Sequence, residues 1–341
     1  MEIYGQNLTY QELLKRAGHL SQVAGIEKQR ISDGPADNML QYKVKTGNYL
    51  EFTMLPTKCM DIGELSYRGI NISYIAKPGL SIPSGCHTDI HDFLRNFPAG
   101  MLYTCGLSNV GVGCTDENNE YHPQHGRIAN TRAENVYAKQ IHEGDDISFE
   151  LGGSTREAAL FGRNIVLHRK LKTKVGSRSV ILEDTVENQT ANDYPILMLY
   201  HFNFGYPFIS EETQLFFEDS KVKLRDGYDE DAIAKSTSIS SPNDNEAERV
   251  FIRKINRDKP TSSVRIENRT LGVGAKLSYR NDNLPYLIQW KSMASGDYVL
   301  GIEPSTCELN GRVKEIEHGN GCCVNAFDSK EFRLELSFYD I

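Results

Sequence analysis

Alternation of apolar and polar residues, repeated along most of the chain after about residue 40, limits the fold more than any other feature. Residues 332–338 read Phe-Arg-Leu-Glu-Leu-Ser-Phe, and residues 147–151 follow the same pattern. Neighbouring side chains of a β-strand point to opposite faces, so this pattern predicts strands with one face in a core. Long helical patterns are absent after the N-terminal segment, which indicates an all-β fold.

Turn signals between these segments indicate that the strands are antiparallel. Residues 167–175 and 180–186 alternate around Gly176-Ser177, which predicts a hairpin. Residues 264–267 add a further strand. Many short strands with Gly, Asn and Asp turns are typical of a sandwich or barrel. The chain has 341 residues, and we predict one large antiparallel β-sandwich over residues 41–341.

The first forty residues have a different character. Thr9 and Glu12 have the spacing of a capping box, an apolar stripe follows over residues 13–17, and Gly18 can end the helix. Residues 1–40 are therefore predicted to form a short helical appendage that packs on the main domain.

Composition excludes several classes of partner. The net charge is −8 and the basic residues are scattered, which argues against a nucleic-acid partner. No apolar stretch approaches the roughly 20 residues that span a bilayer, so no membrane partner is expected. The start of the chain lacks a basic and then apolar signal segment, which favours a cytoplasmic location. The seven cysteines are odd in number and form no C-x-x-C, so neither a disulfide framework nor a zinc site is indicated.

Three short segments carry residues suited to a pocket for a small polar ring. His201 follows an apolar run over residues 196–200 and precedes aromatic residues, an asparagine and a glycine. His125-Gly126-Arg127 and the segment 301–304, Gly-Ile-Glu-Pro, add a second histidine, a guanidinium and the carboxylate of Glu303. Together these segments supply an acid, a base and polar clamps.

The ordered set of segments resembles the aldose 1-epimerase (galactose mutarotase-like) superfamily, and within it the branch called DUF4432. The resemblance runs from about residue 45 to the C-terminus. It rests on Cys-Gly-Leu at 105–107 before His-Gly-Arg at 125–127, on residues 200–207, Tyr-His-Phe-Asn-Phe-Gly-Tyr-Pro, and on Gln-Trp-Lys at 289–291 before the segment 301–304. It implies a galactose mutarotase-like supersandwich with a concave sugar-binding face.

The resemblance also implies roles for individual residues. In such proteins a histidine that maps onto His201 protonates the ring oxygen of the sugar, and a glutamate that maps onto Glu303 takes the proton of the anomeric hydroxyl. A second, substrate-binding histidine maps onto His125. Arg127 stands where other mutarotases place an aromatic residue. The usual sugar-binding aspartate has no convincing match, and Asp229 is a poor candidate for it.

The chemistry of anomer exchange explains why such residues are needed. Ring opening requires one group to remove the proton of O1 while another protonates the ring oxygen, which is general acid–base catalysis without a metal or organic cofactor. Arg127 and Arg95 offer planar forks of donors for sugar hydroxyls or an anionic substituent. Trp290, the only tryptophan, can stack on the C–H face of a sugar ring, although a role in the core is an equal alternative.

Other functions stay open at this point. A noncatalytic carbohydrate-binding protein on the same fold is the main alternative, since the usual aspartate is missing. A glycoside hydrolase or lyase of β-sandwich type is another option, but hydrolysis normally needs two carboxylates, and only Glu303 is convincing. His87, Asp89 and His91 have the spacing of metal ligands on a strand, which leaves a cupin-like metal enzyme as a further option. The sugar is not specified by the sequence. The edge strands of a large sheet can pair two subunits, which leaves a homodimer open.

Overall fold

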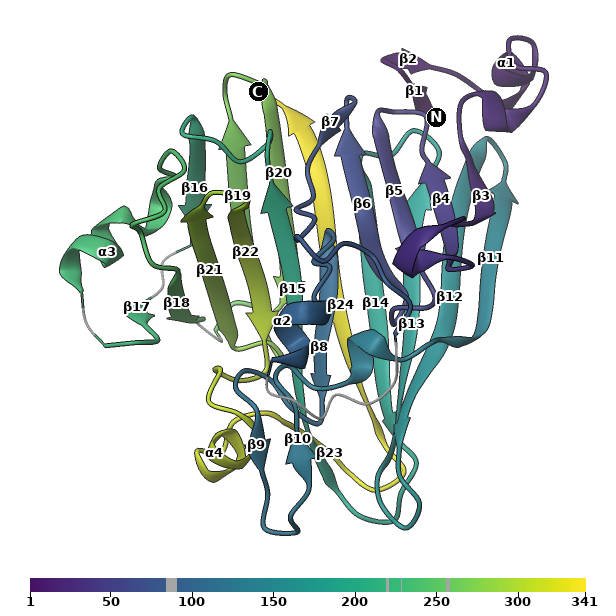
Figure 1. The fold of residues 1–341 in the computed structure, drawn as a ribbon. Coiled ribbons are helices and arrows are strands. Elements are labelled where there is room, and N and C mark those ends of the chain that lie inside the picture. Colours follow the sequence, from purple (N-terminus) through teal and green to yellow (C-terminus); the bar gives the residue numbers. More distant parts are fainter. Residues whose placement is uncertain (84–90, 219–220, 228, 256–257) are drawn as a thin grey trace.

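Two layers of antiparallel strands pack face to face in the computed structural model, which describes residues 1–83, 91–218, 221–227, 229–255 and 258–341. One layer is a single eight-stranded sheet that extends across the whole molecule (Figure 1). Its strands, in spatial order, are β11 (Glu134–Glu143), β12 (Asp146–Ala158), β13 (Asn164–Lys174), β14 (Ser179–Asn188), β24 (Ser329–Asp340), β20 (Val273–Arg280), β19 (Thr261–Asn268) and β16 (Thr213–Phe217).

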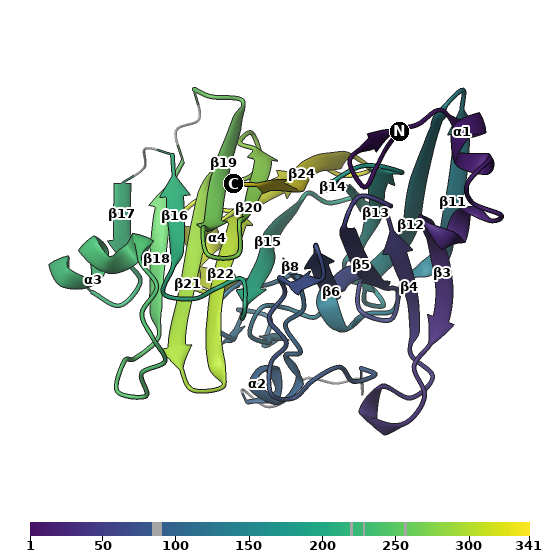
Figure 2. The same ribbon diagram turned by 90° about the horizontal axis from the view of Figure 1, so that it is seen from above.

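The second layer consists of two sheets that lie side by side in front of the first (Figures 1 and 2). The seven-stranded sheet contains β17 (Lys221–Leu224), β18 (Arg249–Lys254), β21 (Tyr286–Ala294), β22 (Asp297–Ser305), β15 (Tyr194–Gly205) and β23 (Cys322–Val324), with β8 (Leu102–Leu107) paired to β15. The five-stranded sheet contains β3 (Gly25–Arg30), β4 (Leu40–Lys45), β5 (Leu50–Leu55), β6 (Asp61–Tyr67) and β7 (Ile70–Asn71).

The remaining elements are short and lie around the two layers. They are β1 (Glu2–Ile3), β2 (Gln6–Asn7), β9 (Cys114–Thr115), β10 (Tyr121–His122), α1 (Tyr10–Leu14), α2 (Asp92–Asn96), α3 (Glu230–Ala234), α4 (Arg312–Glu317) and the 3-10 turns η1 (Leu20–Gln22), η2 (Gly34–Ala36), η3 (Ile128–Asn130) and η4 (Lys235–Thr237). α2 lies on the side of β8 that faces away from the eight-stranded sheet (Figure 2). Within the described ranges, no helix has the length and apolar character that crossing a membrane requires.

The predicted all-β antiparallel sandwich is confirmed. The hairpin around Gly176-Ser177 joins β13 and β14, with Leu171 opposite Leu182. Burial alternates residue by residue along β14, as the sequence pattern requires when one face meets the core and the other meets solvent.

The N-terminal segment differs in part from a purely helical appendage. The capping box of Thr9 and Glu12 forms as predicted, and α1 ends at Leu14. β3, however, pairs with β4 along its whole length, so residues 25–30 complete the edge of the five-stranded sheet. The sequence did not predict this strand, because its side chains are mostly exposed or half-buried and show little alternation of burial.

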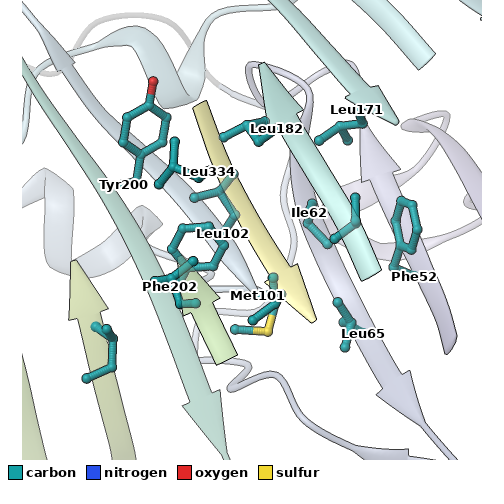
Figure 3. Packing of buried hydrophobic residues seen from close by; sticks show 14 of the residues in the cluster. Phe52, Ile62, Leu65, Met101, Leu102, Leu171, Leu182, Tyr200, Phe202 and Leu334 are labelled. Carbon is teal, nitrogen blue, oxygen red and sulfur yellow. The ribbon is translucent and has the colours of Figure 1, made fainter. Parts of the chain in front are cut away.

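The main core fills the space between the two layers. Figure 3 shows Leu182 and Leu334 of the eight-stranded sheet near Tyr200, Phe202 and Ile62 of the front layer. Along β15, the side chains that point into this core alternate with side chains that point outward. A second apolar cluster lies on the outward side and includes Leu197 and Leu199. β15 is therefore buried on both faces.

A charged network is buried within the main core. The guanidinium of Arg169 donates two hydrogen bonds to the carboxylate of Asp184, at 2.9 and 2.7 Å, and a third of 2.7 Å to Asp61. The hydroxyl of Tyr200 donates to Asp184 at 2.9 Å, and the amide of Thr104 donates to Asp61 at 2.9 Å. The network thus connects the eight-stranded sheet to β15, β8 and β6. A buried charge is tolerated because hydrogen bonds satisfy it.

Replacement of Arg169 by alanine is expected to destabilise the fold strongly, because it leaves Asp61 and Asp184 buried without a cation. Breaking a buried pair in this way costs about 3–5 kcal/mol. Urea unfolding of Arg169→Ala measures the loss. Lys170→Ala, at the exposed neighbouring position of β13, is the control and should change the free energy of unfolding little. A loss of similar size in both variants would contradict this role of the network.

Candidate active site

The pairing of β15 with β22 brings together the two residues predicted to carry catalysis. The register places Phe202 opposite Ile302 and Asn203 opposite Gly301, which puts His201 opposite Glu303 on the outward face. Nε2 of His201 lies 3.2 Å from Oε1 of Glu303. Both residues are buried, with 5% and 1% of their surface exposed.

Gly301 leaves room for this pair. It lies on β22 two residues before Glu303, on the same face, and opposite Trp290 of β21. A Cβ atom at this position would overlap Oε1 of Glu303 and would lie 3.2 Å from Cε1 of His201. A side chain at residue 301 is therefore incompatible with the observed position of the carboxylate.

Burial sets the protonation of the pair. It raises the pKa of Glu303 well above its ordinary value, the nearby charge of Glu248 raises it further, and Arg225 opposes the shift. Burial lowers the pKa of His201 well below its ordinary value, and the neighbouring His125 adds to this effect. Both shifts favour the uncharged forms, a protonated carboxyl beside a neutral imidazole. The pair then holds one titratable proton, which is on the carboxyl of Glu303.

The contact between the pair is close without being a hydrogen bond. Oε1 of Glu303 and Nδ1 of His201 have no hydrogen-bond partner among the described residues. Buried polar atoms in folded proteins nearly always have a partner. Both residues therefore keep hydrogen-bonding capacity that the described residues do not satisfy.

A cavity of about 700 Å³ opens over the pair. Aromatic rings surround the imidazole of His201. The ring of Trp290 has its centroid at 5.4 Å, that of Phe97 at 5.5 Å and that of His125 at 6.0 Å. Phe93 of α2 packs at 4.9 Å on His125. The site thus has an apolar wall and a polar base, the composition that is usual in pockets for small molecules.

Charged residues form the remaining wall of the cavity. The indole N–H of Trp290 donates to Glu248 at 2.9 Å, and Arg225 lies 3.4 Å from the same carboxylate. On another side, Lys77 forms an ion pair of 2.6 Å with Asp297. Sequence reasoning missed these four charged residues. They belong to segments with no motif, and only the tertiary fold brings them to the cavity.

Most of the predicted site residues line this cavity. His201, Glu303, His125, Trp290 and Arg95 all contribute to its surface. The pKa of His125 is lowered to about 4 by burial and by the charge of Arg225, so its ring is neutral near pH 7.

Two residues considered in the sequence lie elsewhere. Arg127 is absent from the cavity lining, and its guanidinium donates a 2.7 Å hydrogen bond to the carbonyl of Tyr121. Asp229 caps the N-terminus of α3, where its carboxylate accepts from the amide of Ala232, and it lines a different cavity. Neither side chain is placed to touch a ligand above His201.

Of the three residues predicted to have the spacing of metal ligands, the structure describes only His91. His87 and Asp89 lie outside the described residues, while His91 is exposed at the start of α2. Within the described part of the chain, one group has the proximity of a metal site: Asp116, Glu120 and His122. Its members already have partners, because Asp116 lies 3.0 Å from His122 within the group and Glu120 lies 2.6 Å from Arg163 outside it.

Comparisons with known proteins agree with this architecture. The profile of a family described as a domain of unknown function, DUF4432, matches residues 38–338. A search of curated protein sequences finds no significant match. Among solved structures, a protein of Klebsiella pneumoniae, provisionally named an aldose 1-epimerase, aligns with a TM-score of 0.85 and 20% identity over 94% of this chain and 86% of its own.

Two further structures extend the similarity. A galactose mutarotase-like protein from Clostridium acetobutylicum aligns with a TM-score of 0.63 and 16% identity over 94% of this chain and all (100%) of its own. A galactose 1-epimerase from Lactobacillus acidophilus aligns with a TM-score of 0.58 and 11% identity over 93% of this chain and 99% of its own. At these identities the likeness shows the fold.

Replacement of Gly301 by alanine is expected to displace the carboxylate of Glu303 while the sandwich stays folded. Overpacking of this kind costs about 1–3 kcal/mol. A crystal structure of Gly301→Ala and its thermal unfolding test both expectations. Gly18→Ala is the matched control, since a Cβ at Gly18 meets no atom within 4 Å. An unmoved carboxylate in Gly301→Ala would contradict this account of the glycine.

Proposed function

The chain belongs to the DUF4432 family and has the galactose mutarotase-like fold, and from this premise we propose that it is an aldose 1-epimerase-like isomerase. The proposed reaction interconverts the α and β anomers of a free sugar or sugar derivative. The observation that carries the proposal is the 3.2 Å contact of His201 with Glu303 at the base of a cavity of about 700 Å³.

The geometry suits the two atoms that exchange protons. The anomeric oxygen and the ring oxygen of a hemiacetal are bonded to the same carbon, so an acid and a base that serve both must be close neighbours. Transfer of the proton on the carboxyl of Glu303 to Nε2 of His201, 3.2 Å away, gives a carboxylate and an imidazolium. Hydroxyls of a bound sugar would favour this form by donating to the carboxylate.

Ring opening then follows from the positions of the two groups. Glu303 takes the proton of the anomeric hydroxyl while His201 gives its proton to the ring oxygen, and the C1–O5 bond breaks to leave an aldehyde. Rotation about C1–C2 and the reverse proton transfers close the ring as the other anomer. The pair begins and ends with one proton, so no external acid or base is consumed.

The walls of the cavity would hold the ring in place. Trp290 offers an aromatic face beside His201, and the neutral ring of His125 can donate to or accept from a hydroxyl. Glu248 and Asp297 line the cavity as carboxylates that can accept from hydroxyls. They are the residues best placed to replace the missing aspartate of the superfamily pattern. Arg95 and Arg225 add guanidinium donors.

Removal of either member of the pair is expected to abolish catalysis. His201→Asn and Glu303→Gln should each lower the rate of anomer exchange by about 10²–10⁴-fold, the usual contribution of a proton-transferring group. Saturation-transfer NMR on a panel of hexoses, pentoses, deoxysugars and uronates measures the exchange. His142→Asn and Glu143→Gln, at exposed positions of β11, are matched controls and should keep the full rate.

The same panel separates the proposal from its main alternative. A noncatalytic carbohydrate-binding protein would bind a sugar with exchange at the rate of free solution in every variant. If the wild type accelerates no sugar that it binds, or if both substitutions leave the acceleration intact, the assignment fails.

The rate of exchange is expected to be flat around neutral pH and to fall on both sides. Below the lower apparent pKa of the pair, a second proton charges His201 while Glu303 stays protonated, which removes the base. Above the higher apparent pKa, the single proton is lost, which removes the acid. Because the pKa of Glu303 is raised and that of His201 is lowered, the plateau should be broad. A pH profile of kcat/KM measures it, and a single limb that crosses pH 7 would contradict the one-proton pair.

A further inference from the structure

A second cavity lies behind the sheet that carries the candidate active site. Its volume is about 510 Å³, and its lining includes residues of β18, β21, α3 and η4. Trp290 and Ser292 of β21 face the first cavity, whereas Lys291 between them faces the second. We call this second space the rear cavity.

Two cations stand side by side in the lining of the rear cavity. Arg249 of β18 is directly opposite Lys291 of β21 in the antiparallel register. Side chains in such a pair have Cβ atoms about 5 Å apart, and like charges in this position destabilise a sheet. The two like charges therefore repel each other across the strand pair, although Asp229 lies 3.7 Å from Arg249.

Lys291 forms no ion pair with any described residue. Only 4% of the residue is exposed, and its ammonium donates one hydrogen bond among the described residues, 3.3 Å to the carbonyl of Lys235. Burial and the charges of Lys235 and Arg249 lower its pKa, while Glu246 opposes the shift. A buried ammonium with three donors and one long hydrogen bond is costly without further partners.

The acidic residues of the rear cavity are occupied or lie at its rim. Asp229 lies 3.7 Å from Arg249 with 45% of its side chain exposed, and Asp231 is 91% exposed. The carboxylate of Glu246 accepts a 3.0 Å hydrogen bond from the hydroxyl of Ser240. The buried ammonium of Lys291 thus lies at the base of the cavity, while Arg249, Lys235 and the acidic residues are more exposed.

We propose that the rear cavity is a binding site for a small oxyanion, held by Lys291 and Arg249. The anion, a phosphate or carboxylate group, would supply the missing partner of the buried ammonium and relieve the repulsion across the strand pair. Arginine and lysine together are a common recognition set for such groups. The proposal does not depend on the isomerase activity.

The fluorescence of Trp290, the only tryptophan, can report binding in the rear cavity. Trp290 precedes Lys291 on β21, and Glu248 precedes Arg249, the first residue of β18, so each residue of the cation pair is next to a residue of the front wall. The two front residues share the 2.9 Å hydrogen bond from Nε1 of Trp290 to Glu248. An anion that draws the rear cations together should change the surroundings of this indole, and hence its fluorescence.

Titration with inorganic phosphate at constant ionic strength, with chloride as the balancing anion, tests the proposal. We expect a saturable change in tryptophan fluorescence and a rise in the melting temperature that follows the occupancy. Lys291→Met and Arg249→Gln should each weaken binding by at least about tenfold, as the loss of one charged hydrogen bond implies. Lys254→Met, an exposed lysine of β18 outside the cavity, should bind as the wild type does. A parallel titration with acetate distinguishes a carboxylate site from a phosphate site.

Each variant has an outcome that would overturn the proposal. Lys291→Met keeps the buried stem and removes an unpaired charge, so it should fold and melt no lower than the wild type without phosphate. The proposal fails if neither anion gives saturable binding, or if Lys291→Met binds as the wild type does. It also fails if Arg225→Gln, in the front cavity, is the variant that loses binding, because the anion would then occupy the candidate active site.

Discussion

The register between β15 and β22 is the constraint on which the candidate site depends. It puts an imidazole and a carboxylate, about one hundred residues apart in sequence, on facing positions of two adjacent strands. Because side chains alternate between the faces of a sheet, a slip of one residue would put Tyr200 in the place of His201 and would direct the imidazole into the main core. Gly301 on the same strand keeps the adjacent space free for the carboxylate. Stability and chemistry thus depend on one strand pairing.

The two faces of β15 divide these tasks. On the inner face, Tyr200 hydrogen-bonds to Asp184, which is held by the buried guanidinium of Arg169. On the outer face, His201 lies beside Glu303 under the aromatic wall of the cavity. The network behind the strand fixes the position of a site in front of it, where burial leaves both groups uncharged. A rigid support of this kind can hold two groups in a buried position where their pKa values differ from those in water.

The sequence predicted those features that local patterns carry. Alternation specified the strands, and the order of the motifs indicated His201, Glu303, His125 and Trp290, all of which line one cavity. Arg127 was different. It is two residues from His125, yet its guanidinium donates a hydrogen bond to the carbonyl of Tyr121. Residues that are neighbours in a loop need not point the same way. Arg225, Glu248 and Asp297 could not be found, since the pairing of β17, β18 and β22 brings them to the cavity from segments without a motif. β3 was missed because the exposed and half-buried side chains of this edge strand show little alternation.

The central claim is that His201 and Glu303 act as one unit that holds a single proton. A double-mutant cycle on the rate of anomer exchange measures this directly, with His201→Asn, Glu303→Gln and the combined variant compared on one sugar. Groups that act as a unit are strongly non-additive. The account predicts that the double variant is no slower than the slower of the two single variants. Losses that multiply in the double variant would show that the two residues work independently, and would contradict it.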